Sequence, residues 1–214
     1  MRSPSILDEI GVRRGTDKSS LGHDYLRFYE SFFAPIRDSP LTILEIGVLN
    51  GASMKVWEEY FPAAKIVGFD TVRSCKQFER DRVIIEIGDQ SRVEDLERVA
   101  YAHGPFDIVI EDGSHRWNHQ ILSIKTLFPA IKPAGVYVVE DLQTNFGPLQ
   151  EKYRHEATMS CVDFLKQWLD LRVGDDMAAP ETHPDPFLRQ YSAFAEHLTF
   201  YRRACLIKKA TASA

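Results

Sequence analysis

Three acidic side chains follow two apolar segments of the sequence and could together hold a metal ion. Asp112 ends the apolar run at residues 106–112. Glu140 and Asp141 end the run at residues 135–141. If both runs are neighbouring parallel strands, their ends lie about 5 Å apart, and carboxylates that close repel unless a cation neutralises them. Oxygen ligands suit Mg²⁺, Mn²⁺ or Ca²⁺ rather than Zn²⁺, so the pattern predicts a site for a hard divalent cation.

This metal site requires a particular local geometry. Consecutive residues in a strand face opposite sides, so Glu140 and Asp141 converge only if the chain turns there. The following Leu-Gln-Thr-Asn permits such a turn. The alternative is that the acids cap helices, as Asp112 or Ser114 would at the helix expected over residues 118–131. We favour the metal site over helix capping, because three acids are expected together beside the glycine-containing loop at residues 45–53.

A histidine close to Asp112 is a candidate general base. His115 follows Gly113 and Ser114, so its imidazole is expected to overhang the same pocket. A neutral imidazole, with a pKa of about 6.5, accepts a proton near neutral pH. His119, one helical turn further on, is the rival candidate.

A glycine-containing loop supplies the second binding feature. The segment Glu45-Ile-Gly-Val-Leu-Asn-Gly-Ala-Ser53 joins an expected strand to an expected helix. Gly47 allows a tight turn, Gly51 allows close approach of a ligand, and the helix start offers free N–H groups. Leu49 replaces the second glycine of the dinucleotide fingerprint, which disfavours a pyrophosphate cofactor. The acidic Glu45 suits a cationic ligand better.

Two further acids lie at the ends of the next expected strands. Asp70 comes about 20 residues after the loop, where a ribose diol is commonly held. Asp89, with Gln90 beside it, ends the third strand and could reach an adenine edge. Ligands of open α/β sheets bind outside such strand ends. We therefore expect one nucleoside-binding cleft there.

Alternating strands and helices are needed to position these residues. The expected strands cover residues 41–47, 65–70, 82–88, 106–112 and 135–141, and the expected helices cover residues 52–60, 93–102 and 118–131. Such βαβ units predict an α/β fold with a mostly parallel sheet and helices on both faces.

The remaining sequence is predicted to complete one domain. We expect helices at 161–173 and 187–197, a proline-rich loop at 177–186, and a C-terminal antiparallel hairpin formed by 197–201 and 204–209. Residues 1–40 read as a helical appendage to a single compact domain at 41–214. From this appendage, Lys18 and Tyr25 could close over the cofactor.

Composition excludes several classes of protein. The 214 residues include 44% hydrophobic and 27% charged residues, as in ordinary globular proteins. The net charge of -5 argues against a nucleic-acid partner. No apolar run approaches the roughly 18 residues that span a bilayer, and the start lacks a signal-peptide pattern. Three scattered cysteines favour neither disulfides nor zinc. A cytoplasmic protein is expected.

The glycine loop with Asp70 and Asp89 resembles the S-adenosylmethionine-dependent methyltransferases of the Rossmann-like class, over residues 41–141. The resemblance implies that Glu45, Gly47 and Gly51 surround the methionine part of the cofactor, with Ser53 close by. It also implies that Asp70 takes the ribose hydroxyls. The same resemblance places Asp89 and Gln90 near the adenine.

Two segments taken together, Glu-Asp-Gly-Ser-His at 111–115 and Val-Val-Glu-Asp-Leu at 138–142, indicate a narrower family than the glycine loop does. They resemble the metal-dependent sugar O-methyltransferases of macrolide biosynthesis, of the mycinamicin type, and the related cephalosporin hydroxylase family. The N-terminal Gly-Thr-Asp-Lys that ends at Lys18 is similar to a segment of that group. The resemblance implies Asp112, Glu140 and Asp141 as Mg²⁺ ligands and His115 as general base.

The leading hypothesis is therefore an O-methyltransferase that acts on a hydroxylated small molecule, such as a sugar of an antibiotic. A catechol-type methyltransferase is the runner-up, because a vicinal diol chelates the same metal. A nicotinamide-dependent oxidoreductase and a non-catalytic, hydroxylase-associated protein are further alternatives. A homo-oligomer stays open.

Overall fold

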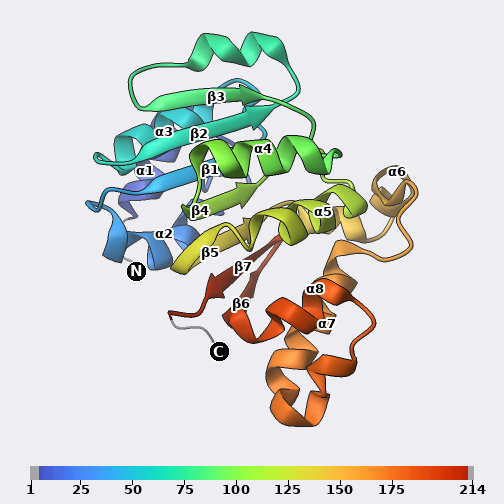
Figure 1. The fold of residues 1–214 in the computed structure, drawn as a ribbon. Coiled ribbons are helices and arrows are strands. Elements are labelled where there is room, and N and C mark those ends of the chain that lie inside the picture. Colours follow the sequence, from blue (N-terminus) through green and yellow to red (C-terminus); the bar gives the residue numbers. More distant parts are fainter. Residues whose placement is uncertain (1–4, 212–214) are drawn as a thin grey trace.

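One seven-stranded mixed sheet forms the centre of the computed structural model, which describes residues 5–211 (Figure 1). Its strands are β1 (Thr42–Ile46), β2 (Lys65–Asp70), β3 (Val83–Ile87), β4 (Phe106–Glu111), β5 (Ile131–Val139), β6 (Ala195–Tyr201) and β7 (Ala204–Lys209). They are arranged in the order β3-β2-β1-β4-β5-β7-β6. β1 to β5 are parallel, and β7 is antiparallel to both β5 and β6. The expected parallel sheet with a C-terminal antiparallel hairpin is confirmed.

Helices cover both faces of this sheet. They are α1 (Ile6–Arg14), α2 (Leu26–Phe33), α3 (Ala52–Tyr60), α4 (Val93–His103), α5 (Trp117–Leu127), α6 (Leu149–Arg154), α7 (Cys161–Gly174) and α8 (Pro186–Tyr191). Figure 1 shows α4 and α5 in front of the sheet, with α1, α2 and α3 behind it. Within residues 5–211, no helix has the length and apolar character that crossing a bilayer requires.

The central strands β1, β2 and β4 are mostly apolar because both of their faces are buried. Ile43 packs in the cluster with Trp57 of α3, whereas its neighbour Leu44 packs in the cluster with Ile124 of α5. This alternation follows from the two-residue period of a strand. The two clusters hold the sheet rigid, so the positions of its strand ends are fixed.

Three expected elements differ from the structure. The helix expected to reach residue 131 ends at Leu127, because Pro129 has no N–H group with which to continue it, and Ile131 already belongs to β5. The helix expected at residues 187–197 ends at Tyr191, and the chain enters β6 at Ala195. The loop expected at residues 177–186 contains short 3₁₀ segments, of which one is Pro180–Thr182.

The N-terminal residues pack directly against the sheet layer. Leu7, Tyr25 and Tyr29 are fully buried and belong to the same cluster as Ile43. The polypeptide between α1 and α2 thereby reaches the carboxyl ends of the strands. The division into a helical appendage at 1–40 and a domain at 41–214 stays a prediction.

Candidate functional site

A cavity of about 890 Å³ opens at the carboxyl ends of the parallel strands. It lies where the strand order reverses between β1 and β4, the topological switch point at which such sheets bind ligands. Most of the residues named from the sequence line it: Lys18, Gly47, Ser53, Asp70, Asp89, Gln90, Asp112, His115, His119 and Asp141. Its described lining does not include Tyr25, Glu45, Gly51 or Glu140.

The loop after β1 depends on two glycines with left-handed backbones. Gly47 has a φ of 94°, and a Cβ there would lie 2.1 Å from the Asp112 carbonyl oxygen. Gly51 has a φ of 70°, and its Cβ would meet the Phe78 ring at 2.6 Å. Gly47 thus allows the β1 and β4 loops to touch. At Gly51 it is the side chain of Phe78, and not the expected ligand, that approaches the backbone closely.

Asp70 holds the same loop from the end of β2. Its Oδ2 accepts hydrogen bonds from the backbone N–H groups of Val48 at 2.8 Å and Leu49 at 3.3 Å. Its Oδ1 accepts from Val72 N at 2.9 Å. The carboxylate therefore fixes the loop and still lines the cavity.

Asp89 and Gln90 follow β3 and have different surroundings. The Asp89 carboxylate accepts a hydrogen bond from Ser91 N at 2.8 Å, and hydrogen bonds from Ser91 lower the pKa of Asp89. Gln90 is buried and donates to Glu111 Oε1 at 2.6 Å, while its own Oε1 accepts from Ser114 N at 2.8 Å. Gln90 therefore positions the loop that leads to the candidate base.

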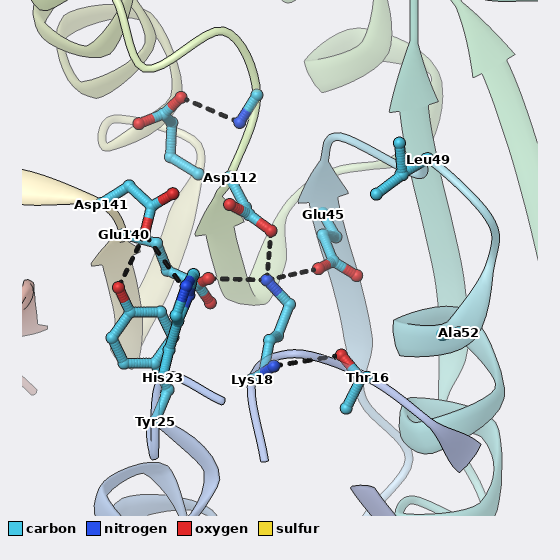
Figure 2. Close-up of polar contacts among 12 residues, drawn as sticks. Thr16, Lys18, His23, Tyr25, Glu45, Leu49, Ala52, Asp112, Glu140 and Asp141 are labelled. Carbon is cyan, nitrogen blue, oxygen red and sulfur yellow. Dashed lines mark hydrogen bonds and ion pairs between the residues drawn. The ribbon is translucent and has the colours of Figure 1, made fainter. Parts of the chain in front are cut away.

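The ammonium group of Lys18 lies among the carboxylates that were predicted to bind a metal (Figure 2). Its ammonium donates hydrogen bonds to Asp112 and, at 2.6 Å, to Glu140 Oε2. Glu45 Oε1 lies 3.3 Å from the same nitrogen. Burial alone would lower the pKa of Lys18, but the charges of these three carboxylates raise it well above its usual value. Lys18 is therefore a permanent positive charge at this point.

Glu45 and Glu140 lie behind Lys18, away from the cavity. Glu45 accepts a hydrogen bond from Trp57 Nε1 at 2.7 Å, and Glu140 accepts one from Tyr29 OH at 2.8 Å. Burial raises the pKa of both carboxyl groups. Both oxygens of Glu140 thus have partners within the protein. Its predicted role as a metal ligand and the predicted contact of Glu45 with a cofactor stay predictions.

Asp112, His115 and Asp141 come together in one group. Each offers a ligand atom, and these atoms lie within 4.8 Å of one another. Asp141 has a φ of 57°, so the chain leaves the extended conformation of β5 at this residue. Asp141 Oδ1 accepts a hydrogen bond from Tyr25 OH at 2.8 Å. The chain does turn after β5, as the metal site requires, and the convergence of Glu140 with Asp141 on one metal stays a prediction.

The two candidate bases have different partners. His115 Nε2 lies 3.4 Å from Asp141 Oδ2, and its buried Nδ1 has no hydrogen-bond partner among the described residues. His119 Nδ1 lies 2.8 Å from Ser114 Oγ. Burial, followed by the charge of Arg116, lowers the pKa of His119. Only His115 belongs to the group with Asp112 and Asp141.

Several site residues were not anticipated from the sequence. Tyr29 supports Glu140, and its spacing of four from Tyr25 indicates the same helical face. Glu111 is fully buried, as strand alternation next to Asp112 would suggest. Tyr153 of α6 lines the cavity with its ring centroid 6.1 Å from that of His115. The irregular sequence around α6 carries no pattern that indicates this placement.

Several known proteins resemble this chain in sequence or in fold. No family model matches the sequence. The chain is 39% identical, over 77% of its length, to 8-demethyl-8-alpha-L-rhamnosyl tetracenomycin-C 2'-O-methyltransferase of Streptomyces olivaceus. It is 37% identical, over 83% of its length, to the 8-demethyl-8-(2-methoxy-alpha-L-rhamnosyl)-tetracenomycin-C 3'-O-methyltransferase of the same organism. The matches cover 45% and 48% of these enzymes, so the chain spans about half the length of the curated relatives it matches.

A solved structure extends the similarity to the whole chain. The MycE methyltransferase of the mycinamycin biosynthetic pathway, in complex with Mg, SAH and mycinamycin VI, superposes with a TM-score of 0.81 at 29% identity. The match covers 98% of this chain and 55% of MycE. By sequence and by structure, this chain is a homologue of the antibiotic-sugar O-methyltransferases and has the Rossmann-like, class I methyltransferase fold.

Proposed function

We propose that this chain is an S-adenosylmethionine-dependent O-methyltransferase that acts, with a divalent cation, on a sugar hydroxyl of a glycosylated natural product. One observation carries the proposal: Asp112, His115 and Asp141 meet at the edge of the cavity that Gly47 and Asp70 also line. The names of the two Streptomyces relatives, both of which act on rhamnosyl tetracenomycins, supply the acceptor class.

The cavity fits a nucleoside cofactor. Its volume of about 890 Å³ lies within the usual range for small-molecule sites, roughly 300 to 1,000 Å³. Asp70 would hold the ribose hydroxyls, and Asp89 with Gln90 would lie near the adenine. Lys18 and Ser53 line the same space. Asp112 lines this space as well.

The group at the cavity edge also fits a divalent cation. Asp112 and Asp141 offer carboxylate oxygens, which Mg²⁺ and Mn²⁺ prefer, and an oxygen of each lies within 4.8 Å of the other. These two residues would hold the metal, with His115 beside it. A bound divalent cation would supply Lewis acidity, which lowers the pKa of a coordinated hydroxyl. Mg²⁺ is the first choice because MycE was solved with Mg.

His115 is the proposed general base. Its imidazole would accept the acceptor's hydroxyl proton as the methyl group leaves the sulfonium. Asp141 Oδ2, 3.4 Å from His115 Nε2, would stabilise the charged ring that results. Tyr25 holds Asp141 in place through its 2.8 Å hydrogen bond. Tyr25 is thus proposed as a positioning residue, although it does not line the cavity.

Labelled methyl transfer tests the proposal. The chain is incubated with methyl-labelled S-adenosylmethionine and rhamnosylated aromatic polyketides, and products are analysed by mass spectrometry. We expect label on the sugar, loss of label after chelation with EDTA, and recovery with Mg²⁺. The matching aglycones and a simple catechol serve as controls. Label on the catechol or aglycone, or full turnover after exhaustive chelation, would contradict the assignment.

Three sequence-based expectations accompany this proposal. They are a cytoplasmic location, a possible homo-oligomer, and the absence of a nucleic-acid partner. Size-exclusion chromatography with light scattering measures the oligomer directly. A change of mass on addition of S-adenosylhomocysteine would link the assembly to the cofactor site.

A further inference from the structure

Lys18 has an unusual position for a lysine, because its side chain is only 2% exposed and is surrounded by acids. These acids come from the ends of three different strands: Glu45 from β1, Asp112 after β4, and Glu140 after β5. The backbone holds Lys18 there as well, since its carbonyl accepts hydrogen bonds from Tyr25 N at 2.9 Å and Leu26 N at 3.2 Å. The ammonium is therefore built into the site.

Asp112 belongs to two groups at once. It accepts a hydrogen bond from Lys18, and it is a member of the group with His115 and Asp141 that could hold a metal ion. Glu45 and Glu140 lie on the side of Lys18 that faces the protein interior, where both are fully or almost fully buried. Asp112 thus lies between a resident ammonium and the proposed metal position.

We propose that Lys18 is the resident cation of this carboxylate cluster and competes with a divalent cation for Asp112. The proposal rests on the metal site of the proposed function. Two positive charges at one carboxylate repel each other. Each therefore weakens the binding of the other, and this coupling is reciprocal. In the absence of metal, Lys18 pairs with all three acids, and with metal it pairs only with Glu45 and Glu140.

Direct Mn²⁺ binding to charge-matched variants tests the competition. Lys18→Gln removes the ammonium but also makes the cluster more negative. Lys18→Gln combined with Glu45→Gln removes one positive and one negative charge, so the formal charge equals that of the wild type. Glu45→Gln alone removes a carboxylate and keeps the competitor. Lys76→Gln, at an exposed lysine paired with Glu79, is the control.

The free Mn²⁺ signal in electron paramagnetic resonance gives the dissociation constants. We expect the double variant to bind Mn²⁺ about tenfold more tightly than the wild type, because its cluster has the same charge and no competitor. Lys18→Gln is expected to bind more tightly still, Glu45→Gln more weakly than the wild type, and Lys76→Gln equally. If Lys18→Gln does not fold, the double variant alone decides the question.

The outcomes separate this proposal from the one on which it rests. Equal or weaker binding by the double variant, with clear binding by the wild type, would overturn the competition and make Lys18 a residue that merely orients Asp112. No binding of Mn²⁺ by any of the proteins would remove the metal site itself, and the competition with it.

Discussion

The imidazole Nε2 of His115 lies 3.4 Å from Oδ2 of Asp141, and both residues have left-handed backbones, with φ values of 56° and 57°. Such backbones are costly for residues other than glycine, so the surrounding structure must impose them. The loops after β4 and β5 are therefore held in a strained backbone conformation in which the candidate base lies close to a carboxylate. This is the pairing expected of a residue that gains a proton during the reaction.

Replacement of His115 is expected to affect turnover more than cofactor binding. His115→Ala should lower kcat by about 10²- to 10⁴-fold, the usual contribution of a general base. Affinity for S-adenosylhomocysteine, measured by calorimetry, should change little. His119→Ala is the matched control, because His119 lines the same cavity but contacts Ser114. A larger loss of kcat in His119→Ala than in His115→Ala would reverse the assignment.

Replacement of Asp70 is expected to affect cofactor binding. Asp70→Ala removes the acceptor for the Val48 and Leu49 N–H groups and for the proposed ribose hydroxyls. Affinity for S-adenosylhomocysteine should fall about tenfold to a hundredfold, since hydrogen bonds to charged groups contribute about 1.5–3 kcal/mol. Asp81→Ala, at an exposed acid before β3, should leave affinity unchanged. Unchanged affinity in Asp70→Ala would show that the ribose lies elsewhere.

Gly47 should tolerate no side chain, because its Cβ would overlap the Asp112 carbonyl. Gly47→Ala is expected to lower the free energy of unfolding by more than about 2 kcal/mol, as it adds a clash to backbone strain. Gly147→Ala is a close control, since Gly147 also has positive φ but open space around it. That change should cost about 1 kcal/mol. Equal costs in chemical denaturation would contradict the close approach of the two loops.

Asp185 should stabilise the C-terminal helices in a pH-dependent way. It caps α8 by accepting from Phe187 N at 2.9 Å, and it pairs with Lys125 of α5 at 2.5 Å. Burial would raise its pKa, but the hydrogen bond and charge of Lys125 lower it. A lowered acid pKa stabilises the protein above the unfolded pKa of about 3.9, and this stability is lost as pH falls through the folded pKa.

Asp185→Ala should therefore lower the free energy of unfolding by about 1 kcal/mol near neutral pH. The difference from the wild type should shrink below the unfolded pKa. Denaturation at several pH values measures it, with Asp170→Ala of α7 as an exposed control. A difference that is constant with pH would mean that packing of the side chain, and not its charge, stabilises α8.

The fold could be predicted from the sequence, and so could the strand ends at which most of the candidate site residues lie. Apolar runs with strand period, separated by helical patterns, predicted β1 to β5, and Gly47, Asp70 and Asp112 follow these strands as expected. The parallel arrangement then places all the strand ends at one edge of the sheet. For the same reason, His115 and Asp141 could be expected to share a cavity.

Contacts between distant loops could not be predicted. Lys18 and Glu140 are 122 positions apart, and no local pattern places an ammonium where a metal was expected to neutralise three acids. The Glu140 side chain is held by Lys18 and by Tyr29 in the core, both of which are distant from it in the sequence. These side-chain contacts depend on tertiary packing, which cannot be predicted from hydrophobic periodicity or from the spacing of residues in the sequence.

Calorimetric titration of S-adenosylhomocysteine into the wild-type chain, with NAD as the comparison ligand, tests the central claim most directly. The claim is that the cavity at the switch point holds the methyl donor, and a binding measurement does not require the acceptor to be known. We expect one site for S-adenosylhomocysteine, weakened by Asp70→Ala, and no measurable binding of NAD. Binding of NAD without binding of S-adenosylhomocysteine would contradict it.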